Sequence, residues 1–170
     1  MHISLIQAVL IAIFYYLSWS PWLTYVGFFT WNRPLLAGFV TGIILGDPVQ
    51  GAIIGAGINM IYLGFISAGG AQMGDPAFAG YVGTALAIAS KLDVSTAMAI
   101  AVPLGTVATV LWIGKMTVNS FFAHWADREV QKGNVDRVAF INIVPPQILL
   151  FAMSFIPALL VVYFGPNAID

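Results

Sequence analysis

The chain has 170 residues, of which 60% are hydrophobic and only 8% are charged, and its mean hydropathy is +0.93. Because a soluble domain carries about 25% charged residues, this composition excludes an ordinary soluble domain and predicts an integral membrane protein. The net charge of −1 offers no basic field for nucleic acid, and the lack of cysteine excludes disulfides and thiolate-bound metals.

Six apolar segments follow one another along the chain, at residues 3–31, 35–45, 49–67, 78–90, 94–114 and 138–165. A membrane-spanning helix needs about 20 mostly apolar residues. The first segment supplies one span, with Pro21 as a kink or break, and the last two supply one span each. The segments 35–45 and 78–90 are too short to span untilted. We therefore expect a single all-α membrane domain over residues 1–170, with several transmembrane helices and broken, re-entrant hairpins.

The stretch from 115 to 137 differs in character from these segments. It holds four of the six Lys and Arg residues of the chain, together with Phe121, Phe122 and Trp125. This mixture predicts an interfacial, partly amphipathic helix followed by a polar loop. By the positive-inside rule the loop lies in the cytoplasm.

Soluble-enzyme motifs are absent from the sequence. The two histidines, His2 and His124, are far apart and lack carboxylates at ligand spacing, so we expect no metal site and no cofactor. There is no phosphate-binding loop and no dinucleotide fingerprint. The sequence therefore carries no obvious means of hydrolysing ATP, and any active transport must draw its energy from elsewhere.

Polar residues within the apolar segments are the candidates for function, because a carboxylate at the centre of a bilayer costs about 2.5–3.5 kcal/mol on insertion scales. Asp47 and Asp75 each precede a proline, so each can also cap the helix that follows. Asn59 can instead form an interhelical hydrogen bond. We predict substrate contact for these residues and for one amide in a glycine-rich stretch: Asp47, Asn59, Gln72 and Asp75.

The lack of positively charged residues in the middle of the chain indicates the charge of the substrate. No Lys or Arg occurs between residues 34 and 90, so an anionic substrate has no counter-charge there. Amides and carboxylates do suit sugar hydroxyls, each of which both donates and accepts a hydrogen bond. The segment therefore favours a neutral polyol.

An ordered set of motifs resembles a known family. "GIILGDPVQGAIIGAGINMIYLG" is followed by "AGGAQMGDPAFAGYVGTALAI", then by "LDVSTAMAIAVPLG" and "HWADREVQKGNVDRVAFINI". This order is similar to that of membrane subunit IIC of the mannose–fructose–sorbose family of the bacterial phosphotransferase system. The likeness covers nearly the whole chain, which resembles the N-terminal part of a longer IIC domain.

The resemblance implies a sugar-translocating subunit in the bacterial inner membrane that crosses it several times. It implies a membrane partner, IID, and cytoplasmic IIA and IIB phosphocarriers, which hold the phosphorylated histidine and modify a hexose or hexose derivative as it arrives. It also implies homo-oligomers of IIC–IID pairs. Two alternatives remain, a small substrate-capture subunit of an ATP-driven vitamin or metabolite importer and a structural membrane protein without transport.

Overall fold

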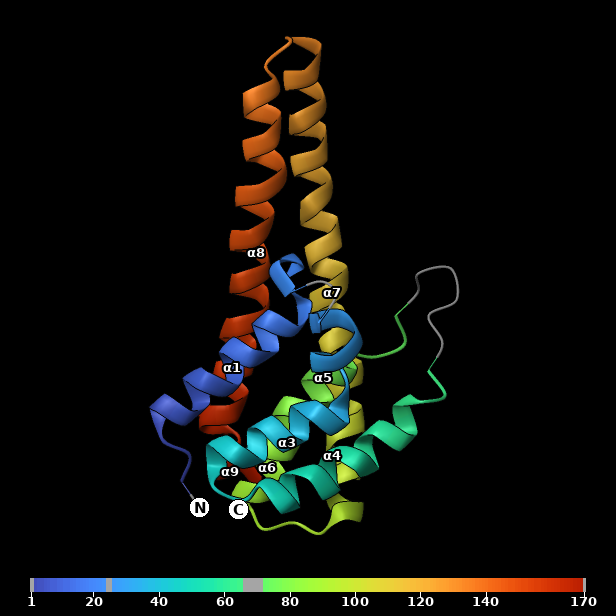
Figure 1. The fold of residues 1–170 in the computed structure, drawn as a ribbon, viewed down its shortest axis with the longest axis vertical. Coiled ribbons are helices and arrows are strands. Elements are labelled where there is room, and N and C mark those ends of the chain that lie inside the picture. The colour runs from blue at the N-terminus through green and yellow to red at the C-terminus, as the bar shows by residue number, and fades with distance from the viewer. Residues whose placement is uncertain (1, 24–25, 66–71, 170) are drawn as a thin grey trace.

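The structure, a computed structural model, describes residues 2–23, 26–65 and 72–169, and these residues form helices and connecting turns without any strand. Figure 1 shows a body of short helices from which two long antiparallel helices project, with both chain ends at the base. In chain order the elements are α1 (Leu5–Trp19), the 3-10 turn η1 (Pro21–Leu23), the π-turn η2 (Gly27–Trp31), α3 (Pro34–Leu45), α4 (Pro48–Tyr62), α5 (Pro76–Phe78), the π-turn η4 (Ala79–Gly83), α6 (Thr84–Ala89), α7 (Val94–Gln131), α8 (Val135–Phe164) and α9 (Pro166–Ile169).

The projecting pair is formed by α7 and α8, which have 38 and 30 residues. At 1.5 Å per residue these helices are about 57 Å and 45 Å long, more than the roughly 30 Å of a hydrocarbon core. Both are long and apolar enough to cross a membrane. The two predicted spans at 94–114 and 138–165 therefore lie in these helices, although α7 continues well beyond its predicted end.

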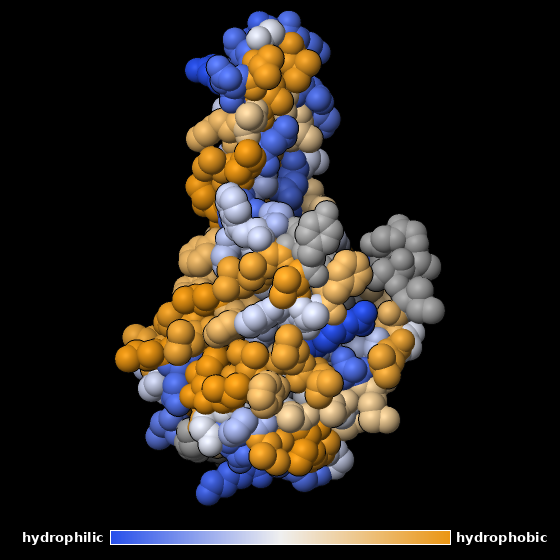
Figure 2. All heavy atoms as spheres, in the orientation of Figure 1, coloured by the Kyte–Doolittle hydropathy of each residue, from blue (hydrophilic) through white to orange (hydrophobic). Residues whose placement is uncertain are grey.

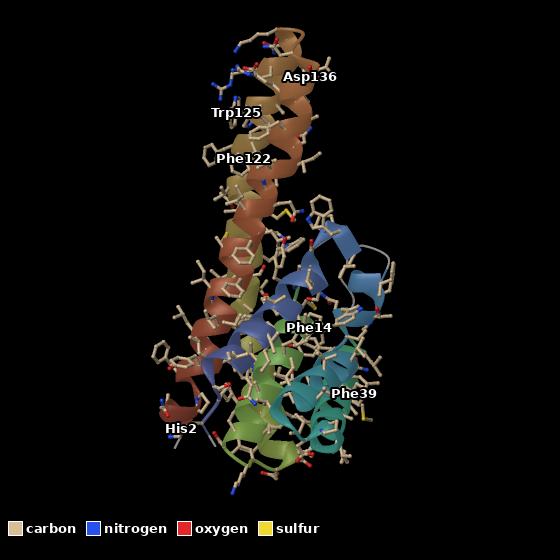
Figure 3. All side chains as sticks on the ribbon, turned by 60° about the vertical axis from the view of Figure 1, so that its left-hand side comes forward. His2, Phe14, Phe39, Phe122, Trp125 and Asp136 are labelled. Atoms are coloured by element: carbon tan, nitrogen blue, oxygen red, sulfur yellow. The ribbon has the colours of Figure 1, made fainter. Side chains whose placement is uncertain are left out.

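The expected separate helix over residues 115–137 is not present as an element of its own. Residues 115–131 continue α7 without a break, and only Lys132, Gly133 and Asn134 separate α7 from α8. Gly114 does not end the helix, because its missing side chain lets the backbone lie against Met153 of α8, where a Cβ would come within 2.9 Å. Trp125 and Asp136 consequently lie near the far end of the hairpin, away from the body (Figure 3).

The far end of the hairpin is held by a buried acid. Glu129 Oε1 accepts from Lys132 Nζ and its Oε2 accepts from Asn134 Nδ2, both at 2.8 Å, and Arg137 Nη1 lies 3.6 Å from the same Oε2. These contacts fix the turn between α7 and α8. Hydrophilic side chains gather around this end in Figure 2, whereas apolar side chains cover much of the body.

The break that was predicted at Pro21 is present in the first apolar segment. Helix α1 ends at Trp19, and Ser20 is extended, with φ −74° and ψ 132°. Pro21 causes this, since a proline disfavours helical backbone at the residue before it. With 15 residues α1 is about 22 Å long, too short to cross the hydrocarbon core untilted.

Helices α3 and α4 form a closely packed hairpin around glycines. A Cβ on Gly38 would lie 2.5 Å from the carbonyl oxygen of Gly51 and 2.7 Å from the Cα of Gly55. The chain reverses at Gly46, whose φ of 87° ends α3 in the left-handed conformation that glycine adopts without strain. The absent side chains let the two backbones approach closely, as small residues do in membrane helix pairs.

The segment from Pro76 to Ala89 lies at the centre of the body. It is one helix that widens into a π-turn over Ala79–Gly83, and all five residues of that turn are buried. Tyr81 and Val82 are fully buried and pack with Tyr15 of α1 in the main apolar cluster. This central helix therefore receives α1 on one side and α7 on another.

Asp93 starts α7 at the base of the body. Its side chain accepts from the backbone N–H of Ser95 at 3.2 Å and from the hydroxyl of Thr96 at 2.5 Å. Hydrogen bonds from the hydroxyls of Ser95 and Thr96 lower the pKa of the Asp93 carboxyl to about 2. The ionised acid is thus the favoured cap of this helix.

Candidate functional site

The site forms around Asp75, where the central helix begins. Asp75 is the N-cap of α5, and its Oδ1 accepts from the backbone N–H of Phe78 at 2.8 Å. Its own backbone N–H donates to the carbonyl of Gly105 in α7, also at 2.8 Å. The sequence explains the capping, because Asp followed by Pro is a favoured start of a helix. The capped end is anchored to the long hairpin by the second bond.

Helix α1 supplies two more donors to the same carboxylate. Tyr15 Oη donates to Asp75 Oδ2 at 2.6 Å, and Trp19 Nε1 donates to the same oxygen at 3.1 Å. The two donors are one helical turn apart and so lie on the same face of α1. Asp75 is only 4% exposed. Three protein donors therefore hold this carboxylate away from water.

A lysine and a second indole approach from α7. Lys115 Nζ lies 4.0 Å from the ring centroid of Trp112 and 5.4 Å from that of Trp19. The two indole rings are themselves 5.1 Å apart between centroids, at an angle of 38°. A cation over the faces of two indoles is a favourable arrangement, because the aromatic quadrupole attracts it.

A small cavity of about 20 Å³ lies among these side chains. That volume holds about one water molecule. Leu150, Met153 and Ser154 of α8 complete its wall. The cavity is lined by a carboxylate, an ammonium, two hydroxyl-bearing side chains, two indoles and three apolar side chains: its residues are Tyr15, Trp19, Asp75, Leu111, Trp112, Lys115, Leu150, Met153 and Ser154.

Of the four predicted site residues, Asp47 lies apart from this cluster. It is exposed and caps α4, accepting from the backbone N–H of Gln50 at 3.0 Å. Tyr62, at the other end of α4, packs against Gly74 and lies close to Gly105, so it marks the Asp75 end of this helix. The 15 residues of α4 separate the two ends by about 22 Å. Asp47 and Asp75 therefore both cap a helix, but they lie at opposite ends of the region that α4 spans.

Asn59 belongs to α4, and Gln72 precedes Asp75 by three residues in the sequence; neither lines the cavity beside Asp75. Asn59 is half-buried, one turn before Tyr62, whose hydroxyl is buried without a hydrogen-bond partner among the described residues. Gln72 is half-buried and directly follows residues 66–71. Those residues, which include part of the glycine-rich stretch expected to form a re-entrant break, lie outside the described residues.

The sequence did not predict the partners of Asp75. Tyr15 and Trp19 belong to the first apolar segment, in which no site residue is predicted, and Lys115 belongs to the predicted interfacial helix. One signal was available, since Trp112 and Lys115 are three residues apart and so share a face of a helix that has no break between them. Nothing local, however, indicates that this face meets α1.

Comparisons with known proteins agree with the motifs. The family model described as the sorbose-specific IIC component of the phosphotransferase system matches residues 5–170. The sorbose-specific EIIC component of Lacticaseibacillus casei is 33% identical over 99% of this chain and 60% of its own length. The mannose-specific EIIC component of Escherichia coli K12 is 37% identical over 78% of this chain and 50% of its own length.

A solved structure is also similar. The mannose transporter ManYZ, in complex with microcin E492, contains a chain that is 33% identical and superposes with a TM-score of 0.82, over 95% of this chain and 64% of that one. The chain thus spans only 50% and 60% of the lengths of the two curated relatives described above. Because the family model matches nearly all of it, the chain belongs to the family of sorbose-specific IIC components of the phosphotransferase system.

Proposed function

We propose that this chain is a sugar-translocating IIC subunit of a phosphoenolpyruvate-dependent phosphotransferase system. It would bind a hexose or hexose derivative and deliver it to a partner that phosphorylates it. The observation that carries the proposal is the Asp75 cluster. In a member of a sugar-transport family, a carboxylate that is 4% exposed lies beside two indoles and a lysine within an otherwise apolar body. Placing a carboxylate within a membrane costs free energy, so a carboxylate that is retained there is a candidate for function.

We propose that Asp75, Gln72 and Asn59 form the sugar site. Gln72 is close to Asp75 in the sequence, and Asn59 is close to the Tyr62 end of α4. Both are half-buried amides, which can donate hydrogen bonds to sugar hydroxyls and accept hydrogen bonds from them. Asp47 is about one length of α4 away. A sugar held at Asp75 would not reach it, so contact with Asp47 belongs to a different stage of transport.

The chain is a membrane protein, by its family and by its two long apolar helices. We further propose that residues 1–170 act as one membrane domain, equivalent to the N-terminal part of a longer IIC domain. The α3–α4 hairpin would be re-entrant, because each helix is too short to cross and the chain turns back at Gly46. The charged end of the hairpin, with Phe122 and Trp125, would lie in the interface on the cytoplasmic side of a bacterial inner membrane.

The partners follow from the family. We propose that the chain pairs with a IID membrane subunit, that such pairs form homo-oligomers, and that cytoplasmic IIA and IIB proteins carry the phosphorylated histidine. Nucleic acid has no place in this scheme, given the net charge of −1.

The proposal is tested by uptake of labelled mannose, fructose, sorbose and N-acetylgalactosamine in cells that also express IID, IIA and IIB proteins. Asp75→Asn and Gln72→Ala should lower uptake while membrane insertion and co-purification with IID persist. Asp93→Asn is the matched control, because Asp93 is also a helix cap but is exposed at the base. Undiminished uptake in both site variants would move the site elsewhere. Uptake that needs ATP and not phosphoenolpyruvate would favour the importer alternative.

A further inference from the structure

Lys115 has no hydrogen-bonding partner among the residues that the structure describes. Its ammonium forms no ion pair with these residues, and it lies over the faces of two indoles. An ammonium has three N–H donors. Contact with Trp112 and Trp19 offsets part of the cost of removing the charge from water, but it gives those N–H groups no acceptor oxygen. The three N–H groups of Lys115 can therefore donate hydrogen bonds to acceptor oxygens of a ligand.

Asp75, unlike Lys115, already has several hydrogen-bonding partners. Its Oδ2 accepts from Tyr15 and Trp19, and its Oδ1 accepts from the backbone of Phe78. Three donors use most of the roughly four acceptor sites of a carboxylate. Asp75 can therefore accept about one hydrogen bond from a sugar hydroxyl, and it also fixes the Trp19 ring beside the cavity. The N–H groups of Lys115 are the main hydrogen-bond donors of the cavity that remain unused, and the hydroxyl of Ser154 in α8 also lines it.

We propose that Lys115 is a ligand-binding residue that donates hydrogen bonds to the oxygen atoms of an uncharged sugar, while the indoles of Trp19 and Trp112 receive the apolar face of its ring. This inference rests on the proposed function. The cavity holds one acid and one base, so a neutral ligand leaves its charges balanced. A sugar phosphate would instead bring a dianion next to the Asp75 carboxylate, which repels it.

The size of the cavity sets a condition on binding. At about 20 Å³ it accommodates one hydroxyl and not a whole ring. The indole centroids are 5.1 Å apart, whereas a ring held between two aromatic faces at normal contact distance needs about 7–8 Å. Trp19 belongs to α1 and Trp112 to the hairpin, so sugar binding widens the seam between these elements. Binding should therefore change the fluorescence of both indoles.

The test measures binding to the purified full-length chain with its IID partner, through tryptophan fluorescence. D-mannose, D-fructose, L-sorbose and N-acetyl-D-galactosamine are the probes, and mannose 6-phosphate is the charged competitor. For each probe that the unmodified protein binds, Lys115→Met should raise Kd about tenfold or more, because a charge-assisted hydrogen bond is lost. Lys115→Arg should recover much of the affinity. Lys91→Met is the control, since Lys91 lies in the turn between α6 and α7, outside the cavity.

A second measurement needs no variant. Bound sugar should slow acylation of Lys115 by an amine-reactive reagent several-fold, as followed by mass spectrometry, with Lys91 and Lys132 unaffected. Unchanged Kd in Lys115→Met together with equal labelling of Lys115 with and without sugar would overturn the role of Lys115 while leaving the proposed function intact. Tighter binding of mannose 6-phosphate than of mannose would overturn the neutral-ligand assignment. If no probe binds the unmodified complex, the proposed function fails and this inference fails with it.

Discussion

The hydrogen bond between Tyr15 and Asp75 offers a direct test of how the site is held together. Tyr15→Phe removes only the hydroxyl that donates to Oδ2 at 2.6 Å. The ring itself should stay in place, because it packs edge-on against Phe78 and Tyr81 at centroid distances of 5.3 Å and 6.5 Å. The variant therefore isolates one hydrogen bond from the packing around it.

The magnitude follows from the acceptor. A hydrogen bond to a charged group contributes about 1.5–3 kcal/mol and a neutral one about 0.5–1.5 kcal/mol. Asp75 is 4% exposed, so bulk water does not reach Oδ2 when the donor is lost, and Trp19 remains as its side-chain donor. We expect Tyr15→Phe to lower the free energy of unfolding by about 1.5–3 kcal/mol.

Tyr16→Phe is the matched control, one residue away on the same helix. Its hydroxyl donates to the neutral amide oxygen of Gln147 at 3.2 Å in a part-buried setting, so its loss should cost about 0.5–1.5 kcal/mol. The assay is reversible unfolding in mixed detergent micelles, followed by circular dichroism. Equal losses in the two variants, or a smaller loss for Tyr15→Phe, would refute the claim that the Asp75 carboxylate depends on α1.

Two further changes test the hairpin of short helices and the start of α7. Gly38→Ala should destabilise the protein by about 1–3 kcal/mol, because the new methyl group meets the backbone of Gly51. Gly57→Ala should destabilise it less, because the flexible Met98 side chain can move aside. Unfolding of both variants in micelles measures the two losses, and equal losses would contradict this expectation. The pKa of Asp93 is lowered on folding, so its ionised form stabilises the protein fully above about pH 4 and this stabilisation is lost as the pH falls toward 2. The difference in thermal midpoint between the unmodified chain and Asp93→Asn should shrink over that interval, and a constant difference would contradict the assignment.

Local sequence rules predicted the ends of several helices and could not predict what those ends meet. Asp47 and Asp75 have the same Gly-Asp-Pro context, and both cap the following helix as that pattern indicates. One of them is exposed at the α3–α4 turn, whereas the other is buried against α1 and α7. Capping depends on the next three residues, but burial depends on which distant helices pack there. Contacts such as Tyr15 with Asp75, 60 residues apart, have no local signature.

The hydropathy pattern placed a boundary after Gly114, where α7 continues as one helix to Gln131. A charged residue after an apolar stretch usually marks an interface, and Lys115 was interpreted in this way. The helix has no proline at this point, and Gly114 is used for close packing with Met153 rather than for a helix end. The cation therefore stays on a continuous helix, and its side chain turns toward indole rings that substitute for water.

The position of Lys115 changes the reason for expecting a neutral ligand. From the sequence, the reason was that no cation occurs between residues 34 and 90. The fold brings the cation of Lys115 to the cavity from outside that range, so the cavity does contain a positive charge. The charge of Asp75 is already held by three donors, however, and it opposes any anion that would approach the lysine. A neutral ligand rich in acceptor oxygens uses the free donors of Lys115 without disturbing this balance, and of the ligand classes considered a sugar satisfies both conditions.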